Sequence, residues 1–357
     1  MGLVRGAGFV YDIKKRRNGM RQGERNMKKI LMGMLLAALL LGGCSGCAKK
    51  SAEAAAVPPT RVQIGVVLID AEDAAASEAQ REGVEQALES LGMQDTQVVW
   101  RFEAGEEQEL LEALQDCVDA GCNLIFTNPH TGRQSPVEQA AQNNPQTEFV
   151  AVGGDTAKTS GLANLHNVSP RLFEAQYVAG IAAGLKLQEL AGNGELDGGD
   201  AEEGVSRLGY VAAFPNAEAI SAYTAYFLGA RSVCEELTMT VRYLNAWQSD
   251  TAEYEAANAL LDAGCVVLGS DAAASGVALA CSERREDGAN VFCAADLNAA
   301  QAKWPSVYAE LIDAFRTGKT LPTDWSAGFD RDAVGLTQTG DAAAVGTADA
   351  QKTAIDG

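Results

Sequence analysis

The chain has 357 residues with 28 Lys or Arg against 48 Asp or Glu, a formal net charge of −20 at pH 7. Residues 1–43 hold nine of the basic residues and only two of the acidic ones, so the remainder carries −27. This acidic balance excludes a nucleic-acid-binding protein, because phosphate repels such a surface. Hydrophobic residues make up 47% of the chain, enough for two domains, since single cores stop growing at about 250–300 residues.

The first element in chain order is a short apolar run, 30–41, which follows Met27-Lys28-Lys29 and precedes Gly42-Gly43-Cys44. It is too short to span a bilayer, whereas a basic start, an apolar middle and small residues before a cysteine are typical of a lipoprotein signal peptide. We therefore expect residues 1–43 to be an upstream segment plus signal peptide. Lipidation of Cys44 would hold the chain at the extracytoplasmic face of the cell membrane. An ordinary secretory signal is the alternative.

A Lys-, Ala-, Ser- and Pro-containing tether, residues 44–60, comes next and has no periodic apolar face. From residue 61 the chain alternates short apolar runs with amphipathic stretches, which is typical of parallel βα units. The apolar runs predict strands at 62–69, 97–102, 124–127, 149–152, 208–212, 238–244, 266–268 and 291–294. The amphipathic stretches predict helices at 76–91, 106–120, 135–143, 171–190, 217–236, 251–263, 274–285 and 304–317.

Two runs, 111–126 and 260–268, share the order helix, Ala-Gly-Cys, strand. Gly121 and Gly264 are predicted to end their helices in a left-handed conformation. The repetition indicates two equivalent α/β lobes. The Gly-rich stretch 191–204 follows a helix and precedes a strand, the reverse of a phosphate-binding loop, so we interpret it as a solvated acidic loop.

Catalytic and metal-binding motifs are scarce. The chain has only His130 and His166, no nucleophile motif and no cysteine spacing typical of zinc sites. We therefore expect no enzyme activity, no cofactor and no metal site, with a carboxylate-only hydrolase as the least favoured alternative. The body cysteines are interpreted as buried thiols, although export leaves open a pairing of Cys281 with Cys293, or of Cys117 with a neighbour.

Ligands of open parallel sheets bind beyond the carboxyl ends of the strands, where this chain places carboxylates and aromatic residues. Aromatic faces can stack on a planar ring, and carboxylates accept hydrogen bonds from hydroxyl or N–H groups. These residue types predict a ligand that combines a ring with hydroxyl groups. Polar loops and helix caps are the structural alternative for any single residue, including Asp73.

Several segments resemble, in order and spacing, the basic membrane protein family of PnrA-like lipoproteins. They are FEAQYVAG at 173–180, RLGYVAAFP at 207–215, FLGARSV at 227–233 and NAWQSD at 245–250, with further segments at 256–264 and 304–318. The agreement is strong from residue 168 to residue 264 and thinner elsewhere. The family comprises nucleoside-binding receptors of ABC importers. The resemblance implies a type I periplasmic-binding-protein fold, two doubly wound parallel-sheet lobes joined by hinge strands, that closes on a ligand and presents it to ABC permease subunits.

The resemblance also implies interleaved lobes. The first lobe would take residues 61–166 with 295–320 returning to it, and the second lobe 167–294 with 321–337 returning to it. Residues 338–357 would form a C-terminal tail. The implied state is a monomer, joined to the membrane through its lipid anchor.

Site residues follow from the same resemblance, residue by residue. Trp247 and Phe214 match cleft-wall positions, Asp271 matches an Asp after a second-lobe strand, and Asp296 matches an Asp at the strand entering the hinge. Further candidates for ligand contact are Trp304, Glu218 and, in the first lobe, Asp73.

One departure concerns the first lobe, where the family places an aromatic residue near its Asp and this chain reads DAEDAAAS at 70–77. Loss of one stacking face removes about 1–3 kcal/mol per base. A purine nucleoside or a related base-containing solute is therefore the first ligand hypothesis. A different solute such as a sugar, or a surface regulatory role without import, is the alternative.

Overall fold

The computed structural model describes residues 58–129, 134–195, 206–246, 249–271 and 275–338. Strands and helices alternate along these ranges. In chain order they are β1 (Ile64–Val67), α2 (Ala75–Ser90), β2 (Val98–Arg101), α3 (Glu107–Asp119), β3 (Leu124–Thr127), α4 (Ser135–Asn143), β4 (Glu148–Val152), α5 (Ala157–Ser160), β5 (Leu165–Pro170), α6 (Leu172–Asn193), β6 (Ser206–Ala212), α7 (Ala217–Val233), β7 (Leu237–Tyr243), α8 (Asp250–Leu261), β8 (Val267–Ser270), α9 (Ser275–Glu286), β9 (Phe292–Cys293), α10 (Ala294–Leu297), β10 (Asn298–Ala302), α11 (Trp304–Arg316), β11 (Asp324–Ala327), the 3₁₀ helix η2 (Phe329–Arg331) and β12 (Val334–Gln338).

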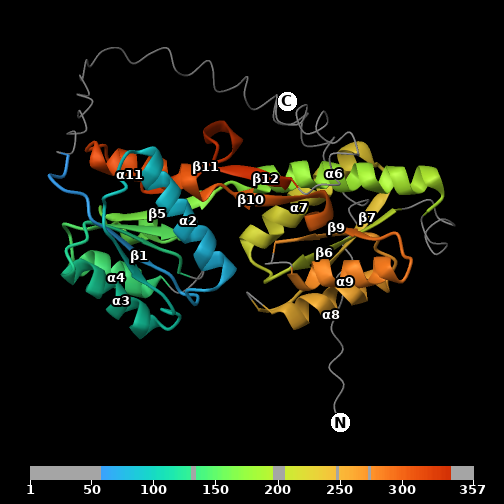
Figure 1. Cartoon of the computed structure of the whole chain (residues 1–357), viewed down its shortest axis with the longest axis horizontal. Helices are drawn as coiled ribbons and strands as arrows, with labels where there is room; N and C mark the ends of the chain where they lie inside the picture. The colour runs from blue at the N-terminus through green and yellow to red at the C-terminus, as the bar shows by residue number, and fades with distance from the viewer. Residues whose placement is uncertain (1–57, 130–133, 196–205, 247–248, 272–274, 339–357) are drawn as a thin grey trace, which may run out of the picture. The chain divides into compact units, whose positions relative to one another are not determined.

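The first lobe is a six-stranded parallel sheet in the order β11-β5-β4-β3-β1-β2. Helices α2 and α11 cover one face and α3 and α4 the other (Figure 1). All four residues of β1 and of β3 are buried. Continuous burial is typical of a parallel strand covered on both faces, which explains why these segments are unbroken apolar runs.

The second lobe repeats this plan with a four-stranded parallel sheet, β7-β6-β8-β9. Helices α6 and α7 pack on one face, and α8 and α9 on the other. Gly180 and Gly229 lie where α6 and α7 touch, and a Cβ at either position would overlap the backbone of the other helix. Gly180 and Gly229 therefore serve the contact between these two helices.

A third unit is the antiparallel ribbon of β10 and β12. Leu336 of β12 packs against the second-lobe core, whereas Trp325 of β11 is buried in the first-lobe core. The expected return of 321–337 to the second lobe is therefore wrong for β11, because Trp325 fills the first core and its strand pairs with β5. Within residues 295–320, α11 has its apolar face in the first-lobe core, whereas β10 pairs with β12.

All eight predicted strands and all eight predicted helices are present, with ends shifted by a few residues. Gly121 and Gly264 have φ values of +90° and +84°, which confirms the left-handed ends of α3 and α8. The sequence patterns did not predict β5, whose Leu-His-Asn-Val-Ser-Pro sequence interrupts the apolar run, nor the short strands β10, β11 and β12. The inclusion of β5 moves the end of the first lobe's strands from residue 166 to Pro170.

Within the described ranges, no helix is both long enough and apolar enough to cross a bilayer. Six cysteines lie in these ranges, all buried and all free thiols: Cys117, Cys122, Cys234, Cys265, Cys281 and Cys293. The predicted lipidation residue Cys44 and the tail 339–357 lie outside the described residues.

Candidate functional site

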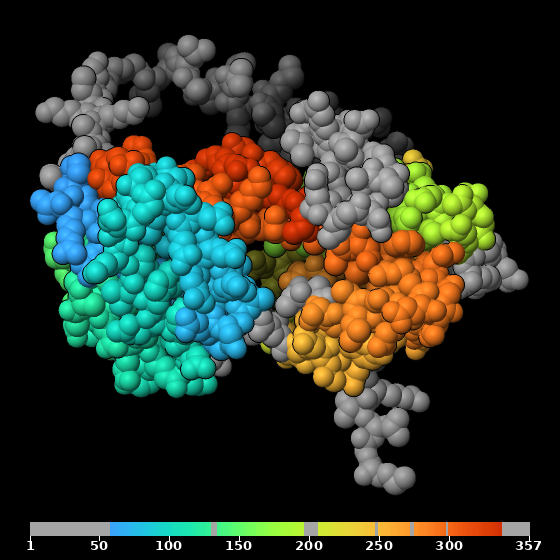
Figure 2. All heavy atoms as spheres, in the orientation of Figure 1, coloured from blue at the N-terminus to red at the C-terminus, as the bar shows by residue number. Residues whose placement is uncertain are grey.

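A cavity of about 950 Å³ opens at the carboxyl ends of both parallel sheets. Figure 2 shows this face of the molecule hollowed between the blue and cyan residues of the first lobe and the orange residues of the second. This is the position where parallel sheets place their ligands, and the volume lies at the upper end of the range of about 300–1,000 Å³ for ligand pockets. Its lining includes Asp70, Ala75, Ala76, Ala79, Gly153, Gly154, Asp155, Arg171, Phe173, Asn216, Glu218, Asp271 and Gln301.

The second-lobe wall is built where β6 and β8 end. Asp271 follows β8, and its Oδ1 accepts a hydrogen bond of 3.1 Å from the backbone N–H of Ala213. Asn216 is the N-cap of α7, and its side chain accepts a 2.8 Å hydrogen bond from the backbone N–H of Ala219. The cap places Glu218 in the first turn of α7, beside Asp271 in the cavity wall.

The two second-lobe carboxylates have shifted pKa values. Burial raises the pKa of Asp271 to about 6, the Ala213 N–H opposes that shift, and the negative charge of Glu218 adds to it. Glu218 is exposed toward the open cavity, but surrounding protein atoms desolvate its carboxylate and raise its pKa. At pH 7 and above, Asp271 is mainly ionised and presents hydrogen-bond acceptors to the cavity.

The first-lobe wall is smoother. Ala75, Ala76 and Ala79 come from the start of α2, and Gly153 and Gly154 follow β4. These side chains leave a broad apolar wall with no aromatic ring.

Two carboxylates flank the first-lobe wall. Asp70 is half-buried. Asp155 is held in place because its Oδ1 accepts a 2.9 Å hydrogen bond from Gln134 Nε2, while its backbone N–H donates to Gln134 Oε1 at 3.0 Å.

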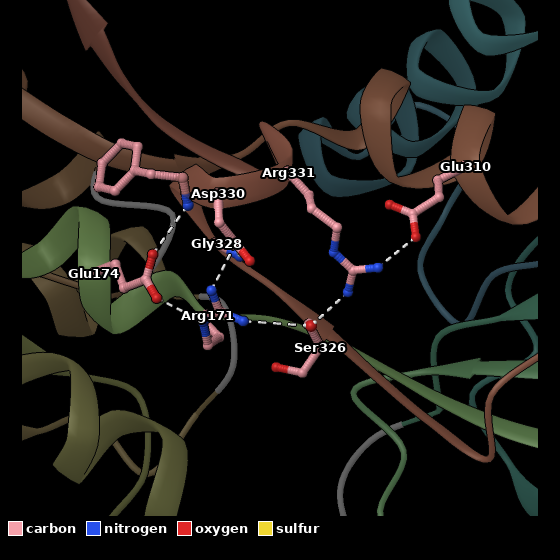
Figure 3. Close-up of polar contacts among 8 residues, drawn as sticks. Arg171, Glu174, Glu310, Ser326, Gly328, Asp330 and Arg331 are labelled. Carbon is pink, nitrogen blue, oxygen red and sulfur yellow. Dashed lines mark hydrogen bonds and ion pairs between the residues drawn. The ribbon is translucent and has the colours of Figure 1, made fainter. Parts of the chain in front are cut away.

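Arg171 is the sole Lys or Arg among the described residues that line the cavity. Its guanidinium lies between two carboxylates, with Nε 2.5 Å from Glu174 Oε1 and Nη2 2.6 Å from Asp330 Oδ1 (Figure 3). The hydrogen bond to Glu174 raises the pKa of Arg171. Because two anions neutralise this cation, it gives the cavity no free positive charge for an anionic ligand.

Two of the predicted site residues, Glu218 and Asp271, line the cavity together. Phe214 is half-buried at the end of β6 but is outside the lining. Asp73 is exposed in the turn before α2, and Asp70 occupies the cavity in its place. Trp247 lies outside the described residues.

The structure places the other two predicted residues away from the cavity. Asp296 on α10 forms a bidentate pair with Arg285, at 2.6 and 3.0 Å, and accepts the backbone N–H of Cys293 at 2.8 Å. Trp304 packs against Gly83 and Tyr308, with ring centroids 6.1 Å apart, in the first-lobe core. Both side chains therefore serve packing between elements.

Sequence reasoning missed Arg171 and Phe173, because it did not recognise the strand that precedes them. Phe173 lies in the first turn of α6 and keeps 43% of its surface exposed, unusual for a Phe. An aromatic residue two positions after an Arg at the end of a strand was the available signal. Gln301 was missed for a different reason, since β10 has no apolar pattern.

The described histidine has a structural position. His166 Nε2 lies 2.8 Å from Glu148 Oε2 and its Nδ1 lies 3.0 Å from the carbonyl oxygen of Pro322. His130 falls outside the described residues. Among the residues that the structure describes, no group of three or more His, Cys, Asp or Glu side chains is arranged to hold a metal ion.

The model of the PnrA-like ABC transporter substrate-binding protein family matches residues 65–302, about two thirds of the chain. The chain belongs to this family. As a PnrA-like substrate-binding protein it has the expected fold: a solute-binding protein of Conexibacter woesei superposes with a TM-score of 0.60 at 16% identity, covering 83% of this chain and 97% of that one. The family and the fold are those of solute-binding proteins and not of enzymes.

Two curated relatives of this PnrA-like protein have named ligands. A putative ABC transporter glucose-binding protein of Haloferax volcanii is 34% identical over 140 residues, which cover 39% of this chain and 31% of that protein. A purine-binding protein of Brucella abortus is 29% identical over 151 residues, covering 42% and 37%. The matched region spans about a third of the length of either relative.

Proposed function

We propose that this substrate-binding protein takes up a purine nucleoside in the cavity between its lobes and presents it to the permease subunits of an ABC importer. The carboxylates of Asp70, Glu218 and Asp271 around the cavity carry the proposal, together with the neutralised charge of Arg171, the one cation among the described lining residues. Such a wall favours an uncharged ligand with several O–H and N–H donors, because carboxylates are acceptors. A nucleotide is disfavoured, since its phosphate would face like charges.

Phe173 supports a ring-bearing ligand. Its partly exposed ring lines the cavity and supplies one stacking face, although no aromatic residue faces it from the Ala75–Ala79 wall. The purine-binding relative supports the same choice. We place Glu218 and Asp271 as acceptors for ligand hydroxyl or N–H groups, with Trp247 and Phe214 as further candidates for the second-lobe wall.

A monosaccharide is the second candidate, and the glucose-binding relative favours it. A sugar also offers hydroxyl donors to carboxylates, but it needs no stacking on two sides of a planar ring. The open, small-residue wall of the first lobe is compatible with either solute.

The deciding experiment is calorimetric titration with adenosine, guanosine, inosine, the pyrimidine nucleosides, free purines, glucose and adenosine monophosphate. Unfolding and refolding of the purified protein beforehand removes any copurified solute. Micromolar or tighter binding of purine nucleosides, with much weaker binding of the monophosphate, supports the proposal. Binding of glucose alone assigns the cavity to a sugar, and tighter binding of the monophosphate than of adenosine overturns the charge argument.

We further propose that the chain is a monomer held at the extracytoplasmic face of the cell membrane by lipid on Cys44. The signal-like run before that cysteine supports this location. Metabolic labelling with a palmitate analogue should mark the wild-type chain and leave Cys44→Ser unlabelled. Equal labelling of both would remove Cys44 as the lipid site.

A further inference from the structure

Two of the three connections between the lobes run side by side; the third leads from β10 into α11. The first leads from β5 through Arg171 into α6, and the second leads from β11 through η2 into β12. The two strands before them are hydrogen-bonded neighbours, and the backbone N–H of Arg171 donates to the carbonyl oxygen of Ala327 at 2.7 Å. Beyond this point both segments pack on the second lobe, through the small residues of α6 and through Leu336.

Four residues join these connections in what we term the clasp: Arg171, Glu174, Gly328 and Asp330. Besides its contacts with Glu174 and Asp330, Arg171 directs Nη1 toward the carbonyl oxygen of Ser326 at 3.4 Å. Glu174 Oε2 accepts a 2.9 Å hydrogen bond from the backbone N–H of Phe329. Figure 3 shows these contacts between the two chain segments, next to the contacts of Arg331 with Ser326 and Glu310.

The backbone of the second connection is shaped to receive Glu174. A Cβ at Gly328 would overlap the Glu174 carboxylate, so only glycine permits this approach. The Gly328 N–H in turn donates to Asp330 Oδ1 at 2.9 Å, and this bond lowers the pKa of Asp330. Arg171 and Glu174 are each about one quarter exposed, so their charge-assisted bonds are less screened than those of a surface pair.

A neighbouring ion pair provides a comparison. Arg331 Nη1 lies 2.5 Å from Glu310 Oε1, and Glu310 also accepts the Trp325 indole N–H at 2.9 Å. Glu310 is on α11 and Trp325 on β11, and both elements belong to the first lobe. This pair therefore joins the second connection, through Arg331 of η2, to the first lobe without reaching α6.

We propose that the clasp sets the equilibrium between wider and narrower arrangements of the two lobes, and thereby scales the affinity for every ligand. Arg171 is the N-cap of α6 and Glu174 lies in its first turn, whereas Phe329 and Asp330 belong to η2. A rotation between the lobes that moves α6 relative to η2 must therefore strain or break the bonds from Arg171 to Asp330 and from Phe329 to Glu174. In this proposal the intact clasp stabilises the arrangement that forms the cavity of about 950 Å³, and a bound ligand favours a narrower one. The inference rests on the proposed solute-binding function, in which the cavity narrows around its ligand.

Arg171 also lines the cavity, so direct ligand contact is the competing explanation. The two roles have different signatures. A change in the population of the binding-competent arrangement multiplies the affinities for all ligands by one common factor. Loss of a contact changes them unequally, because adenosine, inosine and glucose present different groups.

The test compares Glu174→Gln with the matched control Glu310→Gln, which makes the same charge change in the neighbouring pair. Small-angle X-ray scattering of the ligand-free proteins reports the lobe arrangement, and calorimetry with adenosine, inosine and glucose reports affinity. For Glu174→Gln we expect a smaller radius of gyration and a tightening of about three- to tenfold, equal for every probe that binds. The control should match the wild type in both measurements.

Three outcomes would overturn the proposed role of the clasp. They are an unchanged radius of gyration in Glu174→Gln, changes in affinity that differ between ligands, or changes of the same size in Glu310→Gln. Asp330→Asn removes the other carboxylate that contacts Arg171 and should give the same changes in radius of gyration and affinity. If Glu174→Gln does not fold, Asp330→Asn takes its place in the test. If none of the three probes binds the wild type, the proposed function fails. The scattering comparison, which needs no ligand, still decides the clasp.

Discussion

The two lobes share one βα plan, yet they contribute different chemistry to the cavity. The first lobe presents a wall of small side chains from 75–79 and 153–154, and its Asp155 is already bonded to Gln134. The second presents Glu218 and Asp271, both with raised pKa values. The sheets therefore determine where a ligand binds, and the residues of the loops after each strand determine which ligand is bound.

The largest expected effect lies in the second lobe. Asp271→Asn removes a charged acceptor but keeps an oxygen for the Ala213 N–H, so the fold should survive. A hydrogen bond to a charged group contributes about 1.5–3 kcal/mol, and affinity should fall about 10- to 100-fold by calorimetry. The matched first-lobe variant Asp155→Asn should lose less than about threefold. An equal or larger loss of affinity in Asp155→Asn would contradict the conclusion that the second lobe supplies the stronger ligand contacts.

The smooth first-lobe wall can be altered directly. Ala76→Phe introduces an aromatic face opposite the second lobe, and stacking on a base contributes about 1–3 kcal/mol. Titration should show adenosine binding about tenfold tighter, with glucose binding unchanged or weaker. Ala76→Leu adds volume without a π face and should give no gain. Equal gains from Leu and Phe would mean that the wall responds to volume and not to ring stacking.

Affinity should depend on pH through Asp271. Its pKa is raised to about 6, so it is protonated below that pH and loses acceptor capacity. Affinity for a donor-rich ligand should therefore be constant above about pH 7 and fall as pH drops through 6, by at most tenfold per pH unit. Asp271→Asn should flatten this profile. A profile that stays steep in the variant would assign the titration to another group.

The smallest effect is expected at Asp296. Its carboxylate is paired with Arg285 outside the cavity, so Asp296→Asn should leave ligand affinity unchanged. Both partners are about one third exposed, and the free energy of unfolding should fall by about 1 kcal/mol or less in chemical denaturation. If Asp296→Asn binds the ligand more weakly but unfolds with the free energy of the wild type, Asp296 contacts the ligand.

The sequence was sufficient for the regular part of the fold. Parallel strands buried on both faces leave unbroken apolar runs, and left-handed glycines mark the ends of α3 and α8, so both signals are local. Strand β5 was not predicted because it contains polar residues. His166 and Asn167 form hydrogen bonds inside the sheet with Glu148 and Asp324, which are distant in the sequence. The sequence did not predict that β11 belongs to the first lobe, because this depends on the core in which Trp325 is buried.

The cavity was only partly predictable. Asp271 and Glu218 follow strands that the sequence revealed, so their positions agree with the assignment that the resemblance implied. Asp296 and Trp304 were carried over by resemblance, and their side chains are taken up by Arg285 and by Gly83 and Tyr308. A polar residue at such a position can either face a ligand or bond to a neighbouring side chain. Three-dimensional contacts determine which of the two occurs, and the spacing of residues in the sequence does not encode them.

The pairing of β5 with β11 has a kinetic consequence. Asn167 lies opposite Asp324 in the register, a separation of 157 residues, so β11 reaches its partner late in synthesis. At about 5–20 residues per second, this strand is made roughly 8–30 s after β5. During that interval the β5 edge has no neighbour, and an unpaired edge is a template for wrong pairing. A nascent chain of this architecture therefore needs either a chaperone or delayed folding until its last strands have emerged.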